Sequence, residues 1–241
     1  MAYFSPIPLD EDWHVHSTFS DGVDTIDANI VAAAARGLQH LGCVDHVRRD
    51  TTYLPGYVAA VEEARASTPI ALTIGIEAKI LDAFGTLDLP EVPKAVDLIY
   101  VADHQFPGPD GPISPRIIRE GIAAGERDRA GVLEQLASAT IASMRRHASR
   151  QTLVLAHLFS IVPKMGLSED DIPDDTLRAI AECAAATSTI IEVSERWRCP
   201  SARMIALCIA SGVRMVASTD SHRSSDIAAW DYVRTRAEEV G

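Results

Sequence analysis

The chain has few cysteines, and no two of them form a paired motif. Its 241 residues contain only Cys43, Cys183, Cys199 and Cys208, and none of these has the Cys-x-x-Cys spacing. This pattern argues against both a thiolate zinc site and a disulfide framework. We expect buried free thiols in a reducing compartment.

Segments that direct a chain to a membrane are also absent from the sequence. No apolar run approaches the length that spans a bilayer, and residues 1–6 show neither the basic region nor the apolar core of a signal peptide. We therefore expect a cytoplasmic protein with no membrane partner.

Positive charge is scarce. Lysine and arginine number 22 against 34 aspartates and glutamates, which gives a formal net charge of -12. A strongly negative protein repels nucleic-acid backbones, so a nucleic-acid polymer is not the expected partner. A small anion held at a local positive centre stays compatible with this charge.

The remaining bulk properties describe one ordinary globular domain. The hydrophobic fraction is 47%, the charged fraction is 23%, and internal repeats and low-complexity tracts are absent. A chain of this length can bury a large core as a single unit, so we predict one domain over residues 1–241. The predicted helices show no unpaired apolar stripe, and the sequence therefore gives no basis for an oligomeric state.

The sequence does contain seven short apolar runs that each lead into a histidine, aspartate or glutamate. Short apolar runs with polar ends are typical of parallel strands whose carboxyl ends converge on one site. The runs cover residues 12–16, 41–46, 72–77, 98–104, 153–157, 190–195 and 215–222.

Helical patterns separate these runs. Alternation of strands and helices is the βαβ signature, and it predicts an incomplete (β/α) barrel with about seven strands, where eight is the standard number. The predicted helices cover residues 25–36, 55–66, 116–148 with a break near Gly125, 174–186, 200–211 and 226–240.

Two connections are irregular. Residues 106–115 are rich in glycine and proline, and they follow a candidate ligand directly, so a lid over a pocket and a tight connector are both open interpretations. Between the third and fourth runs, residues 87–89 could form an extra short strand.

The polar ends of the runs make a candidate metal-ligand set. Side chains alternate along a strand, so His14 and His16 share one face, as do Asp220 and His222, and the two pairs become neighbours across the barrel seam. Imidazoles and carboxylates are ligands for zinc, iron or manganese. The candidate ligands are His14, His16, Asp21, His46, Glu77, His104, His157, Asp220 and His222.

This set exceeds what one ion can use, so two or three divalent ions are implied, with Glu77 central enough to bridge. Asp21 lies in the loop after the first strand and can reach back over the site. Asp45 and Asp103 each precede a ligand histidine and point to the opposite side, where they could support the ligands. Glu192 faces the barrel interior, and we do not assign it as a ligand.

In this order the motifs resemble the PHP family (polymerase and histidinol phosphatase), and the resemblance spans essentially the whole chain. Family members have a distorted seven-stranded TIM-like barrel with a trinuclear metal centre, and that is the fold the resemblance implies. The motifs that carry it are His14-x-His16, Ser20-Asp21-Gly22, Asp45-His46, Gly75-Ile-Glu77, His104, His157 and Ser218-Thr-Asp220-Ser-His222.

The resemblance also implies how the ligands divide. One ion would take His14, His16, Glu77 and Asp220. A second would take Glu77, His104 and His157. The third would take Asp21, His46 and His222. Family members carry histidine or aspartate at the position of Asp21, so no ligand is missing from this chain.

Charge then indicates the chemistry. Three divalent ions bring about +6 and the three carboxylates return about -3, so a positive pocket is left that would attract a phosphate ester. A metal-bridging hydroxide would attack phosphorus. Glu77 and Asp220 are the candidate catalytic residues, although a metal-bound water is the safer proton donor because a ligating Asp220 has a low pKa.

Arginines should complete the phosphate site, since a guanidinium binds phosphate oxygens bidentately. The strongest candidates are Arg196 and Arg198, which directly follow the sixth strand. For any one of the candidates, a solvated loop cation is the more ordinary interpretation. The others are Arg48, Arg49 and Arg223.

The leading hypothesis is a metal-dependent phosphoesterase for a small phosphorylated metabolite, such as histidinol phosphate, a nucleotide or a sugar phosphate. An amidohydrolase-type C–N hydrolase is the first alternative, but that class often bridges its metals with a carboxylated lysine, and Lys79 is displaced by two residues from Glu77. The second alternative is a non-enzymatic metal-bound accessory domain. Exonuclease activity is disfavoured by the net charge.

Overall fold

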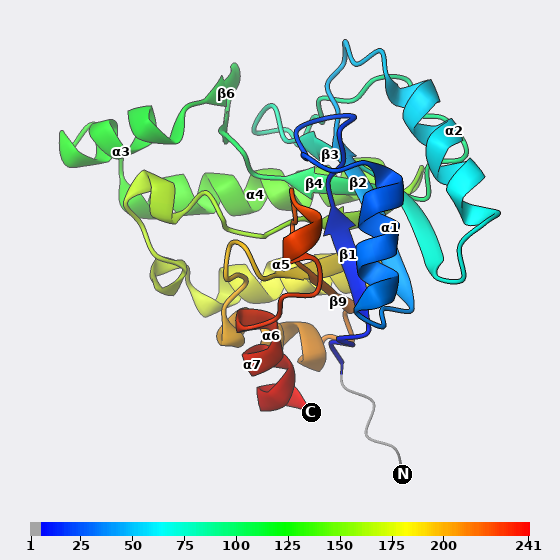
Figure 1. The fold of residues 1–241 in the computed structure, drawn as a ribbon. Helices are drawn as coiled ribbons and strands as arrows, with labels where there is room; N and C mark the ends of the chain where they lie inside the picture. The colour runs from blue at the N-terminus through cyan, green and yellow to red at the C-terminus, as the bar shows by residue number, and fades with distance from the viewer. Residues whose placement is uncertain (1–5) are drawn as a thin grey trace.

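The computed structural model describes residues 6–241, and its main feature is one seven-stranded sheet in which all neighbouring strands are parallel (Figure 1). The strand order is β1-β2-β3-β4-β7-β8-β9. The strands are β1 (Glu11–Val15), β2 (His40–His46), β3 (Ala71–Lys79), β4 (Leu98–Ala102), β7 (Thr152–Leu155), β8 (Ile190–Ser194) and β9 (Met215–Ser218).

The two edges of this sheet approach each other just beyond β1 and β9. The His16 amide donates to the Ser221 carbonyl at 2.8 Å, and the Ser221 amide donates to the His14 carbonyl at 3.2 Å. These bonds nearly close the sheet into a barrel, and they confirm the predicted seven-stranded (β/α) architecture.

A helix follows each strand of this sheet except β3, which leads to β4 without one, and the helices cover the outside of the sheet (Figure 1). They are α1 (Ile26–Ala35), α2 (Leu54–Arg65), α3 (Pro115–Ala123), α4 (Arg129–His147), α5 (Asp174–Thr187), α6 (Ala202–Ala210) and α7 (Tyr232–Val240), with short 3₁₀ turns at η1 (Pro163–Met165), η2 (Glu169–Asp171) and η3 (Ser224–Asp226). No helix within residues 6–241 is long and apolar enough to cross a membrane.

The helix boundaries have local causes. The predicted break near Gly125 is confirmed: Gly125 has φ +73°, and the Asp128 side chain accepts from the Gly131 amide to begin α4. The last helix begins at Tyr232 instead of residue 226. Its start is set by the Glu195 carboxylate, which accepts the backbone N–H groups of Asp231, Tyr232 and Val233.

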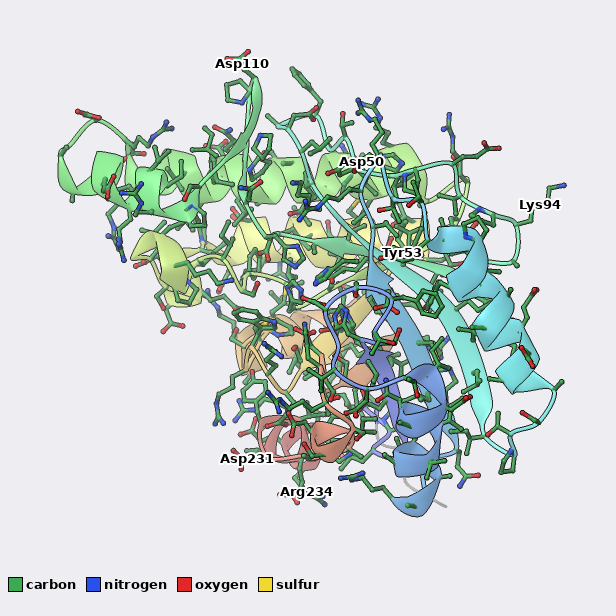
Figure 2. The ribbon with its side chains drawn as sticks, turned by 45° about the horizontal axis from the view of Figure 1, so that its top comes forward. Asp50, Tyr53, Lys94, Asp110, Asp231 and Arg234 are labelled. Carbon is green, nitrogen blue, oxygen red and sulfur yellow. The ribbon has the colours of Figure 1, made fainter. Side chains whose placement is uncertain are left out.

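Residues 106–115 contain a small hairpin. Its antiparallel strands are β5 (Phe106–Gly108) and β6 (Gly111–Ile113), and Asp110 marks the tip, which stands away from the barrel (Figure 2). The Gln135 side chain on α4 donates to the Pro107 carbonyl at 2.8 Å and ties the hairpin to that helix. The extra strand expected at residues 87–89 does not form, and Leu87 makes only an isolated bridge with Ile80.

A buried cluster fills the inside of the barrel below its carboxyl end. Tyr100 is its largest fully buried member, and its hydroxyl donates to the Trp13 carbonyl. Gly75 makes room for this ring, because a Cβ there would lie 2.7 Å from a ring carbon of Tyr100. The Tyr100 ring in turn lies 4.8 Å from the His14 ring, so the packed interior supports the residues above it.

We predict that Asp12→Ala destabilises the barrel. The buried Asp12 carboxylate accepts the Thr219 amide and hydroxyl and the Ala228 amide, and it therefore joins β1 to the loop after β9. Loss of these bonds leaves buried donors without partners and should lower the free energy of unfolding by about 2–4 kcal/mol. Urea titration of the metal-free protein measures this. The control Asp10→Ala removes an exposed neighbouring carboxylate and should change stability by less than about 0.5 kcal/mol.

Candidate metal centre

The nine residues predicted as ligands lie together at the carboxyl end of the barrel. His14, His46 and Glu77 belong to β1, β2 and β3, and the other six lie just after strands. Parallel strands end on the same side of a barrel, so side chains distant in sequence become neighbours here.

Glu77 is the centre of this group, and it is only 1% exposed. Its Oε1 lies 2.9 Å from His157 Nε2 and 3.2 Å from His104 Nε2. Its Oε2 lies 2.7 Å from His46 Nδ1. The same oxygen is 3.7 Å from Nε2 of both His14 and His16. Each carboxylate oxygen therefore faces a different set of histidines, as a bridging ligand requires.

Two aspartates complete the group from loops. Asp220 Oδ1 lies 3.1 Å from His16 Nε2. Asp21 Oδ2 lies 3.4 Å from Nε2 of both His46 and His222, and half of the Asp21 side chain is exposed. The loop after the first strand thus reaches back over the site.

The ligand atoms form three overlapping groups, in each of which all atoms lie within 4.8 Å of one another. His16 and His46 each belong to two groups, whereas the resemblance assigned each to one ion. His157 lies outside the three groups although it is in contact with Glu77. The groups are His14, His16 and Asp220; His16, Asp21, His46 and His222; and His46, Glu77 and His104.

Several buried polar atoms at this site lack a hydrogen-bond partner in residues 6–241. They include His14 Nε2, both ring nitrogens of His16 and Glu77 Oε2. Buried polar atoms are almost always paired, because an unpaired one costs free energy. The lone pairs of imidazole and carboxylate are metal ligands, so this donor set fits divalent cations.

The protonation states of the two carboxylates also suit the binding of a divalent cation. Burial alone would raise the pKa of Glu77, but His104, His14 and His157 hold it well below its usual range. Burial alone would also raise the pKa of Asp220, but the neighbouring His16 and His14 rings lower it below its usual range. Burial lowers the pKa of His16 to about 4. The two carboxylates are therefore ionised and His16 is neutral, which are ligating forms. Burial opposes protonation of His46 and His157, but Glu77 and the neighbouring aspartates raise the pKa of both rings to about 10, so a cation would have to displace a proton from these two rings.

A row of buried carboxylates behind the ligands holds them in place. Glu192 accepts the His14 Nδ1–H at 2.7 Å and the His157 amide at 3.2 Å, so His14 presents Nε2 to the site. Asp103 accepts the Ser160 hydroxyl at 2.8 Å, and that hydroxyl lies 3.0 Å from His157 Nδ1. Such partners fix the tautomer and orientation of ligating histidines.

Asp45 supports the loop that carries Asp21. Its carboxylate accepts the amides of Ser17 and Ser20 at 3.1 and 3.2 Å, and it also accepts both hydroxyls. The sequence placed Asp45 and Asp103 behind the ligands. The sequence also predicted that Glu192 faces the barrel interior. It could not predict the contact between Glu192 and His14, because that contact depends on how distant strands are arranged in the sheet.

Two of the gathered residues have uncommon backbone conformations. His157 has φ +32° and Asp220 has φ +50°, and neither is a glycine. Left-handed backbone in such residues is strained and gathers at functional sites. The chain thus accepts local strain where it presents these two side chains.

One of the predicted arginines contacts the candidate ligands directly, and the other four do not. Arg196 lies 2.9 Å from His222 Nδ1 and 3.3 Å from the Asp220 carbonyl. Arg198 has φ +52° and turns outward to Asp231, at the edge of the molecule in Figure 2. In the described residues, the side chains of Arg48, Arg49 and Arg223 form no hydrogen bond or ion pair with the nine candidate ligands.

An open cavity of about 820 Å³ lies beside the candidate ligands. Asp21, His46, Glu77 and His104 contribute to its wall. Phe19, Tyr53, Arg48, Lys79 and Gln105 line the rest, and Figure 2 labels Tyr53. The cavity can hold a small organic group next to the centre.

Sequence reasoning missed the contacts of Trp197 and Lys164. The Trp197 indole N–H donates to Asp220 Oδ2 at 2.6 Å, and the Lys164 ammonium lies 3.9 Å from the centre of the indole ring. Trp197 stands between two arginines that the sequence did single out. Lys164 follows His157 by seven residues and belongs to no motif.

We predict that Glu192→Gln weakens zinc binding by about 10–100-fold, because it removes the charge that orients His14 Nδ1–H. Titration of metal-free protein against a competing chelator measures the affinity. The control Glu182→Gln changes an exposed residue of α5 and should bind zinc as the native protein does. Equal affinities for the two variants would show that Glu192 does not support the site.

Comparison with known proteins agrees with the fold. The model of the PHP domain family matches residues 12–161, which contain all the candidate ligands except Asp220 and His222. No curated protein sequence shows a significant match.

A similar solved structure is the histidinol phosphate phosphatase of Lactococcus lactis, determined with zinc, L-histidinol and phosphate. It superposes with a TM-score of 0.68 at 17% identity, covering 96% of this chain and 93% of that chain. The family model extends over more than half of the sequence, and the structure has the predicted seven-stranded barrel; the chain belongs to the PHP domain family.

Proposed function

We propose that this protein is a metal-dependent phosphoesterase that hydrolyses a phosphate ester of a small metabolite at a centre of two or three divalent ions. The observation that carries the proposal is a group of buried atoms around Glu77 that lack a hydrogen-bond partner within residues 6–241: His14 Nε2, both ring nitrogens of His16, and Glu77 Oε2. Family membership supports the same reaction class.

The residues that would hold the ions are the nine gathered at the carboxyl end of the barrel, and zinc, manganese and iron all suit such ligands. Bound divalent cations would attract phosphate oxygens and acidify water at the site. Glu77 supplies a negative charge that lies close to five of the candidate histidines. Asp220 stays ionised through His16 and His14, so we assign it a ligand role and not that of proton donor to the leaving group.

The rest of the site suits a small phosphorylated molecule. Arg196 is the predicted arginine that reaches the ligands, and a guanidinium there would meet phosphate oxygens. The adjoining cavity of about 820 Å³ would take the alcohol portion of the ester. The net charge of -12 argues against a nucleic-acid polymer. Histidinol phosphate is one candidate substrate, because the similar Lactococcus lactis structure holds L-histidinol and phosphate.

The alternatives receive less support. A C–N hydrolase of the amidohydrolase type would place a modified lysine between its metals, but Lys79 Nζ lies 3.6 Å from Asp88 Oδ2 in an ion pair. A non-enzymatic accessory domain has no need of an open cavity beside its metal ligands.

We predict phosphate release from at least one member of a panel of about a hundred phosphorylated metabolites, assayed with zinc, manganese and iron. Glu77→Ala should lower the rate about 1,000-fold or more, since Glu77 contacts ligands of every group. The control Glu62→Ala changes an exposed residue of α2 and should keep full activity. Absence of phosphate release with all three metals would contradict the proposal.

Asp21→Ala should lower the number of bound ions by one, because Asp21 contacts His46, His222 and His16 and none of the other candidate ligands. Elemental analysis of zinc-reconstituted protein measures the count. The exposed Asp27, in the first turn of α1, provides the control Asp27→Ala, which should bind as many ions as the native chain. An unchanged count in the Asp21 variant would remove the case for a third ion.

A further inference from the structure

Trp197 lies at the site but belongs to none of the motifs that define the ligands. It follows β8 within the segment that connects this strand to α6, and its ring centre lies 5.7 Å from that of His157. Its indole N–H donates to Asp220 Oδ2 at 2.6 Å, a short bond to an ionised acceptor. The edge of the indole is therefore fixed by a candidate metal ligand.

Because of this bond, the two carboxylate oxygens of Asp220 have different contacts. Oδ1 faces the site, 3.1 Å from His16 Nε2 and 3.7 Å from His222 Nδ1. Oδ2 is occupied by the indole. A carboxylate held in this way offers one oxygen to a cation, and its rotation is restricted by the bulky ring.

The face of the same ring carries a cation. Lys164 Nζ lies 3.9 Å from the ring centre, which is the geometry of a cation–π contact. Lys164 is exposed to solvent overall; partial burial lowers the pKa of its ammonium, and the carboxylates of Asp103 and Asp220 oppose this. In the part of the chain that the structure describes, Lys164 forms no ion pair within 4.0 Å and no hydrogen bond.

The neighbouring cations are engaged elsewhere. Arg198 pairs with Asp231 and stacks on Tyr232, outside the site. Arg196 bonds the Asp220 carbonyl and contacts His222, with its guanidinium 5.9 Å from the Trp197 ring centre. Lys164 thus differs from both arginines: it is near the carboxylates of the site but is paired with none.

We propose that Trp197 is a positioning residue with two separable parts. Its N–H holds Asp220 as a one-oxygen metal ligand, and its ring face holds Lys164 where the ammonium meets a phosphate oxygen of the substrate. The second part rests on the phosphoesterase function proposed above, and the first part does not.

The N–H part is tested by zinc affinity and not by activity. Trp197→Phe keeps an aromatic face for Lys164 but removes the donor, and it should weaken zinc binding about tenfold or more. The matched control is Trp230→Phe, which also loses one indole bond, to the Leu9 carbonyl, on a different part of the chain. It should bind zinc as tightly as the native protein. Equal affinities for the two variants would overturn this part.

A measurement on the native chain keeps the test valid if Trp197→Phe does not fold. In protein labelled with ¹⁵N-tryptophan, the indole N–H resonance of Trp197 should shift when zinc is added, because its acceptor becomes a ligand. The resonances of Trp13 and Trp230 should move less, since they donate to Glu11 and to the Leu9 carbonyl. If the indole N–H resonance of Trp197 does not shift when zinc is added, the proposal is contradicted.

The ring-face part is tested with inorganic phosphate. Lys164→Met should weaken phosphate binding to the zinc-reconstituted protein about tenfold while leaving zinc affinity unchanged. Lys94→Met is the control, since Lys94 is exposed and lies at the far edge of the molecule in Figure 2. Native phosphate affinity in the Lys164 variant would overturn this part. If zinc affinity responds as expected but no phosphoester is hydrolysed, the Asp220 assignment stands and the proposed function fails.

Discussion

The site depends on one buried negative charge. Glu77 is 1% exposed, and its two oxygens face five histidines that come from different strands and loops. A buried carboxylate is costly unless positive charge surrounds it. The barrel surrounds this carboxylate with imidazole rings, and within residues 6–241 several nitrogens of these rings lack hydrogen-bond partners. Divalent cations bound there would supply the positive charge and would satisfy these nitrogens and the carboxylate at the same time.

The surrounding fold holds several of the candidate ligands from behind. Asp12 joins the first strand to the loop after the last one, Asp45 holds the loop of Asp21, and Glu192 joins His14 to the backbone of His157. These carboxylates are buried, and each one accepts several N–H or O–H groups. Trp197 plays a comparable part for Asp220 from the open side of the site. The rigidity of the centre therefore comes from polar contacts between loops as well as from the packed barrel.

Sequence patterns predicted the barrel, and they predicted that the candidate ligand residues lie at one end of it, because both expectations follow from strand alternation and from the polar ends of apolar runs. Sequence patterns did not predict contacts between residues that are far apart along the chain. The start of α7 at Tyr232 is set by Glu195, and the roles of Glu192 and Lys164 are set by neighbours far along the chain. Closeness in sequence also misplaced Arg198, whose left-handed backbone turns it toward Asp231.

A crystal structure of the zinc-reconstituted protein with inorganic phosphate would test the account most directly. We expect anomalous scattering to reveal two or three zinc ions around Glu77, with phosphate between them and the side chains of Arg196 and Lys164. Zinc bound away from Glu77, or phosphate bound away from the metal ions, would contradict the assignment of this site as a phosphoesterase centre.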